Sequence, residues 1–191
     1  MALVEDIFSH KLYIEENVLE QSVWEKLKED ALAIYQSSES DHSFLADVWS
    51  NHNSSDLISD ANFLPLMEKT LRHVNWFANY FGDNIRLECT SAWLNVYKGR
   101  QYQEQHTHQR NHLSAVYFLE CENTSAPLIL SNPYQDHMPF KGIGGSQQII
   151  PPRQNGLVIF PSYVPHFVPP VGQVEGRRMT IAFNFIQSLS S

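Results

Sequence analysis

Three histidines in the second half of the chain have the residue type and spacing of metal ligands. His106 and His108 are two residues apart in QYQEQHTHQR, and His166 lies in FPSYVPHFVPP. If the first segment is a β-strand, both imidazoles project from one face and can share a metal such as iron, zinc, copper or nickel. Prolines on either side of His166 would hold it rigidly, as a metal ligand requires. The pattern predicts one catalytic metal site of three histidines; an H-x-H pair on a solvated strand face is the alternative for the pair taken alone.

An arginine follows His166 by twelve residues, in RMTIAFNF. Strand alternation places Arg178 on a small, polar face together with Thr180 and Asn184, while Arg177 points to the opposite face. An arginine on such a face would point into a barrel, where its guanidinium could bind a carboxylate through two hydrogen bonds. The alternative is that Arg177 and Arg178 form an exposed basic pair at a strand start.

Composition favours one globular domain without a nucleic-acid or membrane partner. The chain has 191 residues, of which 42% are hydrophobic and 18% charged, and its formal net charge is −8. An acidic chain of this kind is a poor match for polyanionic partners. The segment MALVEDIFSH has no basic region followed by a long apolar one, and Cys89 and Cys121 have no disulfide or metal spacing. We therefore expect a cytoplasmic protein with one domain over 1–191.

The elements that must position the histidines are strands. From residue 85 onward, short apolar runs alternate with Pro- and Gly-containing turns, which is typical of a sandwich or barrel and leaves no room for crossover helices. We expect a double-stranded β-helix (jelly roll) core over 85–187. The expected strands are 86–97, 102–108, 113–120, 126–131, 147–150, 156–160, 165–168 and 178–186.

Residues 1–84 are expected to form a helical cover outside this barrel. Apolar spacing predicts helices over 22–37, opened by a capping box of Ser22 and Glu25, and over 63–81, ended by Gly82. Residues 7–14 form a candidate edge strand. Segments 38–58 and 132–146 are expected to be loops near the barrel mouth. The histidines of this half are expected to be ordinary surface or capping residues: His10, His42, His52 and His73.

The segments NVYKGRQYQEQHTHQRNHLSAVYFL and GLVIFPSYVPHFVPPVGQVEGRRMTIAFNF resemble the Fe(II)/2-oxoglutarate-dependent dioxygenases. The likeness covers roughly residues 86–186 and is greatest to short, single-domain oxygenases of bacteria and phages, with a more distant likeness to prolyl hydroxylases. It implies Fe(II) and dioxygen chemistry in which 2-oxoglutarate is decarboxylated to succinate while a substrate, such as a protein or peptide side chain, is hydroxylated. It also implies that Arg178 binds the distal carboxylate of 2-oxoglutarate, with Tyr97, Asn95 and Ser114 as further candidate contacts.

One departure from the family pattern concerns His108, which takes the place of the usual carboxylate ligand. Three interpretations stay open: a three-histidine centre, Glu104 as the oxygen ligand from the same strand face, or one histidine that orients other groups.

Two other kinds of protein share the barrel. A cupin-type metalloprotein, such as an isomerase or a dioxygenase without 2-oxoglutarate, could add His112 to the ligands but has no general need for Arg178. A non-enzymatic jelly-roll module would hold only a structural metal.

Overall fold

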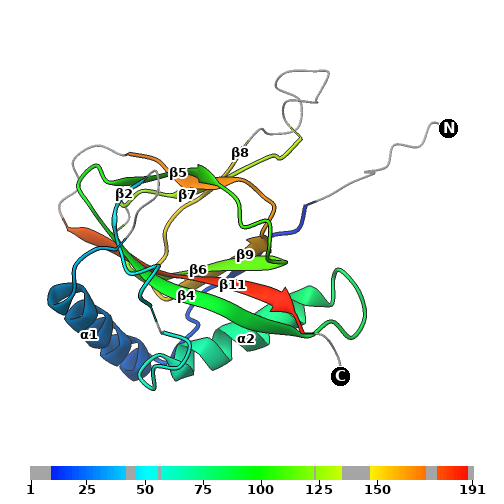
Figure 1. The fold of residues 1–191 in the computed structure, drawn as a ribbon, viewed down its shortest axis with the longest axis horizontal. Helices are drawn as coiled ribbons and strands as arrows, with labels where there is room; N and C mark the ends of the chain where they lie inside the picture. The colour runs from blue at the N-terminus through cyan, green and yellow to red at the C-terminus, as the bar shows by residue number, and fades with distance from the viewer. Residues whose placement is uncertain are drawn as a thin grey trace.

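Two antiparallel β-sheets lie face to face, and two helices cover the outer face of the larger one (Figure 1). The computed structural model describes residues 10–41, 46–55, 57–122, 124–134, 147–170 and 176–188. The helices are α1 (Gln21–Ser37) and α2 (Leu64–Ala78). The strands are β1 (Tyr13–Glu15), β2 (Ala46–Asp47), β3 (Trp49–Ser50), β4 (Leu87–Lys98), β5 (Tyr102–His106), β6 (Leu113–Glu120), β7 (Leu128–Ser131), β8 (Gln147–Ile150), β9 (Gly156–Pro161), β10 (His166–Val168) and β11 (Arg177–Gln187).

The strand order is that of a double-stranded β-helix, as expected. The six-stranded sheet runs β1-β9-β6-β11-β4-β3, and the five-stranded sheet runs β2-β5-β10-β7-β8. Every pairing between the strands is antiparallel. The expected strands of the barrel all form, each within two residues of its expected bounds. Alternation along β4 and β11 therefore gives the large sheet one face toward the helices and one toward the small sheet.

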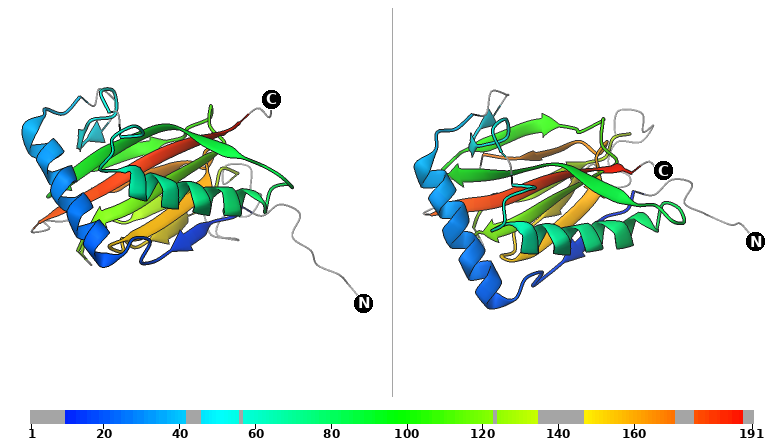
Figure 2. Two further views of the ribbon diagram at one scale, coloured as in Figure 1. Left: turned by 90° about the horizontal axis from the view of Figure 1, so that it is seen from below. Right: turned by 60° about the horizontal axis from the view of Figure 1, so that its bottom comes forward.

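The main core lies between the large sheet and the helices. The two helices cover neighbouring parts of the sheet and run in different directions (Figure 2). Leu27 and Ala31 of α1 and Val74 and Phe77 of α2 are buried against strand residues such as Leu94. Because the helices share this core with the sheet, the predicted cover over 1–84 and the predicted barrel over 85–187 bury one common apolar surface.

The first helix begins one residue earlier than expected, and its predicted capping box does not form. Glu20 is the N-cap and makes no capping hydrogen bond through its side chain, while Glu25 accepts a hydrogen bond from Gln21. Ser22 lies inside the first turn, so its hydroxyl does not occupy the capping position that the prediction required.

The second helix ends at Ala78, four residues before Gly82. The chain continues in tight turns, in which the Tyr80 and Phe81 amides donate to the carbonyls of Phe77 and Ala78. Phe81 is 47% exposed, so it does not extend the buried apolar stripe as predicted.

The segment between the helices is more ordered than a simple loop. Its strands β2 and β3 are separated by one residue, yet β2 pairs with β5 in the small sheet and β3 pairs with β4 in the large sheet. The segment therefore connects the two sheets along one edge of the barrel. Of the other expected elements, the edge strand over 7–14 forms only from Tyr13 onward, as β1. Residues 7–9, 42–45 (with His42), 56 and 135–146 lie outside the described residues.

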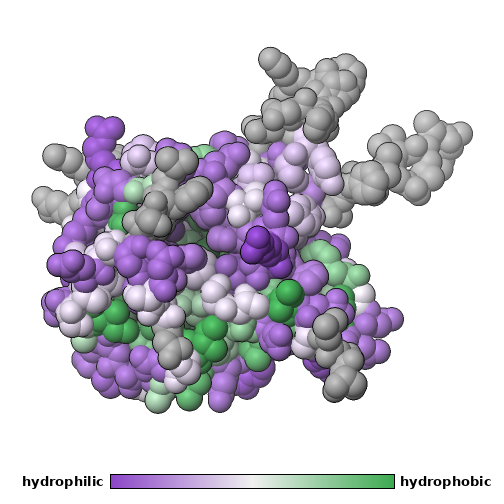
Figure 3. All heavy atoms as spheres, viewed as in Figure 1, coloured by the Kyte–Doolittle hydropathy of each residue, from purple (hydrophilic) through white to green (hydrophobic). Residues whose placement is uncertain are grey.

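Hydrophilic residues cover most of the face seen in Figure 3, and the hydrophobic ones gather in its lower half, where Figure 1 has the helices. Neither of the two described helices is long and apolar enough to cross a membrane.

Candidate metal centre and cofactor cavity

A cavity of about 620 Å³ lies between the two sheets and brings the predicted site residues together. The small sheet contributes His106 and His166, and the large sheet contributes Arg178 and Asn95. His108, just beyond the end of β5, lines the same cavity. The barrel interior is thus a hollow with titratable groups from both walls, which is the usual form of a ligand site.

His106, His108 and His166 form a cluster in which one ligand atom from each lies within 4.8 Å of the others. The ring centroids are 4.3 Å apart for His106 and His166, 5.0 Å for His106 and His108, and 5.1 Å for His108 and His166. Three imidazoles at this spacing can ligate a single metal ion and leave coordination positions for other ligands.

Backbone carbonyls orient two of these rings. The Nδ1–H of His106 donates to the Glu104 carbonyl at 2.8 Å, and the Nδ1–H of His166 donates to the Val164 carbonyl at 3.0 Å. A carbonyl oxygen only accepts, so Nδ1 carries the hydrogen and Nε2 keeps its lone pair. This is how proteins fix the tautomer of a metal-binding histidine.

The surroundings of the cluster keep two of its imidazoles, those of His108 and His166, neutral. Burial, together with the neighbouring His106 and His52, lowers the pKa of His108 to about 4. Burial and the imidazoles of His106 and His108 lower the pKa of His166 well below its ordinary value. Neutral imidazole is the form that binds metals, so at neutral pH these two groups need lose no proton before they bind a metal.

Two alternative ligands lie outside the cluster. Glu104 is exposed and does not line the cavity, which overturns the expectation that it shares a face with His106. The cause is a β-bulge: His166 pairs with His106 but Val168 pairs with Gln103, so the alternation of β5 is broken between them. His112 is also exposed, and its Nδ1 accepts a hydrogen bond from the Gln187 amide, so it does not add a fourth ligand.

Arg178 is buried at the cavity wall, with 3% of its surface exposed. Its guanidinium carbon lies 4.7 Å from the centroid of the Tyr97 ring and 5.3 Å from that of Phe118. Among the described residues, two of its donors, Nε and Nη1, find no hydrogen-bond partner. Buried donors without a partner are costly, and a bound carboxylate would satisfy both of them.

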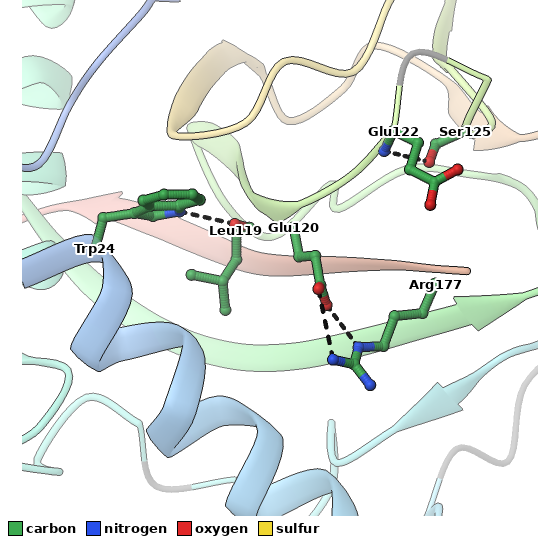
Figure 4. A network of polar contacts seen from close by, with 6 residues as sticks. All are labelled: Trp24, Leu119, Glu120, Glu122, Ser125 and Arg177. Carbon is green, nitrogen blue, oxygen red and sulfur yellow. Dashed lines mark hydrogen bonds and ion pairs between the residues drawn. The ribbon is translucent and has the colours of Figure 1, made fainter. Parts of the chain in front are cut away.

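Arg177 points away from the cavity, as alternation predicts. Its Nε donates to Glu120 at 2.6 Å, and Figure 4 shows this pair beside the contact of Trp24 in α1 with the Leu119 carbonyl. The two adjacent arginines are therefore not an exposed basic pair: Arg177 pairs with a carboxylate of the protein, and Arg178 has no such partner in the part of the chain that the structure describes.

The remaining predicted contacts line the cavity in different ways. Asn95 and Tyr97 share the inner face of β4, and burial raises the pKa of the Tyr97 phenol, which therefore stays neutral. Ser114 is buried and bonded within the protein: its Oγ lies 2.8 Å from Ser162 Oγ and donates to Asn184 Oδ1 at 2.8 Å. Of the three, Ser114 thus has the least freedom to contact a cofactor.

Sequence reasoning missed the residues at one rim of the cavity. His52 and Asn53 line it from the segment before α2, although His52 was expected to be an ordinary surface histidine. The His52 ring lies edge-on to Trp93 with centroids 4.6 Å apart, and Trp93 lies 5.9 Å from the His108 ring. Alternation with Asn95 and Tyr97 could have identified Trp93, but no sequence signal identifies His52.

Comparisons with known proteins identify a family model and solved structures to which this chain is similar. Residues 91–184 match the family model described as "Putative 2OG-Fe(II) oxygenase", where 2OG stands for 2-oxoglutarate. No curated protein matches the sequence at a significant level.

Solved structures of low sequence identity share the fold. A prolyl-4-hydroxylase from Pseudomonas putida is 14% identical, with 95% of each chain covered and a TM-score of 0.70. A prolyl hydroxylase from Trichoplax adhaerens, in complex with a peptide fragment of hypoxia inducible factor, is 16% identical, with 92% of this chain and 83% of that chain covered and a TM-score of 0.65. HygX from Streptomyces hygroscopicus, with nickel, 2-oxoglutarate and hygromycin B bound, is 11% identical, with 93% and 83% covered and a TM-score of 0.68.

The fold and the histidine cluster define a metal-dependent enzyme built on a double-stranded β-helix. The core of the chain, residues 91–184, matches the model of the 2OG-Fe(II) oxygenases, and the protein is an oxidoreductase that uses Fe(II), 2-oxoglutarate and dioxygen.

Proposed function

We propose that His106, His108 and His166 bind the Fe(II) of this dioxygenase and that Arg178 binds the distal carboxylate of 2-oxoglutarate. The observation that carries the proposal is the pairing of a three-imidazole cluster with a buried guanidinium whose Nε and Nη1 lack partners, in one cavity. When bound, the iron supplies the oxidation of the substrate by dioxygen, coupled to decarboxylation of 2-oxoglutarate to succinate.

The chain's own residues orient the reactants and exclude water. Nε2 of His106 and of His166 would face the metal, because their Nδ1 atoms are bonded to backbone carbonyls. The Tyr97 and Phe118 rings flank Arg178, which fixes the plane of the guanidinium. Asn95, on the same face as Tyr97, has a side-chain amide that can hydrogen-bond to a ligand between Arg178 and the histidines.

We also propose that the primary substrate is a protein or peptide side chain, in the reducing environment of the cytoplasm. Two of the proteins with the same fold are prolyl hydroxylases, one of them in complex with a peptide. Cys89 and Cys121 are free thiols, which is the usual state in a reducing compartment.

The proposal is tested by titrating the protein with Fe(II) and 2-oxoglutarate without oxygen, and then by admitting oxygen. The expected results are a metal-to-ligand absorption band that needs both components, and succinate formation that needs both components and oxygen. Iron bound without any effect of 2-oxoglutarate would instead favour a structural metal site. Succinate formation is then compared in the presence of capped peptides and of small metabolites. Acceleration by one of these two classes of compound identifies the class of the primary substrate.

A further inference from the structure

The rim of the cavity beside Trp93 is held rigidly to the large sheet. Asn51, which is 6% exposed, donates from its amide to the Leu94 carbonyl at 3.3 Å, and its Oδ1 accepts from the Leu94 amide at 2.8 Å. Ser55 Oγ donates to the Ala92 carbonyl at 2.7 Å. The segment is therefore bonded to β4 on both sides of Trp93, which fixes the position of the rim.

Asp41 bonds the outer side of the same segment. Its carboxylate accepts hydrogen bonds from the amides of Asn53 at 3.2 Å and Ser54 at 2.7 Å, and its carbonyl accepts from Asn53 Nδ2 at 2.6 Å. These bonds place the exposed His52 ring over Trp93 next to His108. The His52 and Trp93 rings thus make a preformed aromatic wall beside the histidine cluster.

The charges around this wall are unusual for an acidic protein. Among the described residues that line the cavity, Arg178 is the only Lys, Arg, Asp or Glu, and the other polar groups are amides, hydroxyls and imidazoles such as Asn53 and Gln105. A divalent metal, three neutral imidazoles, the two carboxylates of 2-oxoglutarate and one guanidinium leave one net positive charge in the loaded cavity. A cationic side chain would be repelled there.

We propose that His52 and Trp93 form the subsite for the primary substrate and that this subsite takes an uncharged side chain of a peptide and rejects a cationic one. Side-chain amides at the rim both donate and accept hydrogen bonds, as a peptide backbone does. The wall supplies flat apolar area for the side chain itself. The inference rests on the proposed function, because it uses the three-histidine centre and bound 2-oxoglutarate.

The test uses the protein loaded with Mn(II) and 2-oxoglutarate, with capped tripeptides acetyl-Gly-X-Gly-amide as probes. X is norleucine or lysine, so that the cationic side chain has an uncharged counterpart of similar shape. The measurement is the paramagnetic relaxation of the peptide protons by Mn(II), which detects weak binding close to the metal. We expect at least threefold more relaxation for norleucine than for lysine.

Variants then connect this selectivity to the rim. His52→Ala and Trp93→Leu should each reduce the relaxation of the norleucine peptide at least threefold, with circular dichroism showing that the fold is retained. His52→Asp should raise the relaxation of the lysine peptide toward that of norleucine, because its carboxylate offsets the net positive charge. His112→Asp makes the same charge change at an exposed position outside the cavity and should leave the ratio unchanged.

The possible failures are distinguishable. If Mn(II) or 2-oxoglutarate does not bind the wild-type protein, the proposed function fails, and this inference fails with it. If both bind but no peptide is relaxed, or the lysine peptide is relaxed as much as the norleucine peptide, only the inference is overturned. Equal effects of His52→Asp and His112→Asp would show that the selectivity arises from overall charge rather than from the rim.

Discussion

His106 and His166 are direct partners across the β5–β10 ladder, and their imidazole centroids are 4.3 Å apart. The bulge that precedes His106 in β5 turns Glu104 away from the cavity and leaves His106 facing it. The small sheet thus brings together two histidines that are sixty residues apart in the sequence. His108 completes the cluster from the turn after β5, where its backbone amide donates to the Ser162 carbonyl at 2.9 Å.

Removing one of these histidines should strongly weaken metal binding. Loss of groups that only orient a ligand typically costs ten- to a hundredfold in metal affinity, so loss of a ligand itself in His166→Ala should raise the Kd for Ni(II) by at least about tenfold. Calorimetric titration measures this effect, and circular dichroism checks the fold. His112→Ala is the matched control, because His112 is exposed outside the cluster. An unchanged Kd in His166→Ala would remove His166 from the ligand set.

His108 allows a test in the opposite direction, because it takes the place of the usual carboxylate. In His108→Asp, a carboxylate would offset one positive charge of the metal. We therefore expect Fe(II) affinity to be retained or increased, in contrast to His108→Ala. The measurement is anaerobic Fe(II) titration of both variants. If His108→Asp loses iron to the same extent as His108→Ala, His108 has a role other than ligation.

Acid should release the metal only at unusually low pH. Protons compete with metal for imidazole, and an ordinary histidine with a pKa near 6.5 would lose about tenfold in affinity between pH 7.5 and pH 5.5. Burial lowers the pKa of His108 to about 4 and also lowers that of His166, so competition at these two ligands begins at lower pH. Ni(II) affinity measured from pH 7.5 to 5.5 should therefore fall by less than about tenfold. A fall of a hundredfold or more would show that these pKa values are not depressed.

The barrel could be predicted from the sequence because its strands carry their own signals. Alternation of apolar residues and Pro- or Gly-containing turns indicated the strands, and the same alternation separated Arg178 from Arg177. The cluster of His106, His108 and His166 followed from strand geometry and from the resemblance to a known family.

The misses arise where long-range contacts override local pattern. The bulge in β5 depends on its pairing with β10, so the sequence of β5 alone placed Glu104 on the wrong face. His52 reaches the cavity only because β3 pairs with β4 and because the buried Asn51 bonds to Leu94. A segment rich in Ser, Asp and Asn has no periodicity, and the hydrogen bonds that order it come from a strand forty residues away.

Asn155 should contribute strongly to stability because it joins the start of α1 to the sheet. It is buried with a positive φ of 59°; its Oδ1 accepts from the Leu19 amide and the Tyr117 hydroxyl, and its Nδ2 donates to the Leu19 carbonyl. Each such bond is worth about 1 kcal/mol, and asparagine tolerates this φ better than alanine does. Asn155→Ala should lower the free energy of unfolding by roughly 2–4 kcal/mol.

Urea denaturation measures this loss, and Tyr117→Phe, which removes only one of the bonds, should cost about 1 kcal/mol. A single unfolding transition in both variants is expected, because the helices and the sheet share one core. Two separate transitions would contradict the prediction of one domain over residues 1–191.

Arg178 provides the sharpest test of the cofactor site. A guanidinium in a buried cavity forms charge-assisted hydrogen bonds to a carboxylate, each worth about 1.5–3 kcal/mol, so Arg178→Ala should weaken 2-oxoglutarate binding by at least about tenfold. Arg178→Lys keeps the charge but not the planar pair of donors, so its affinity for 2-oxoglutarate should be intermediate.

Arg177→Ala is the matched control, since Arg177 is bonded to Glu120 outside the cavity and its loss should change the affinity little. The measurement is the 2-oxoglutarate dependence of the metal-to-ligand absorption band. Equal affinities in the wild-type protein and Arg178→Ala, or a larger loss in Arg177→Ala, would show that the unpartnered donors of Arg178 do not bind the co-substrate.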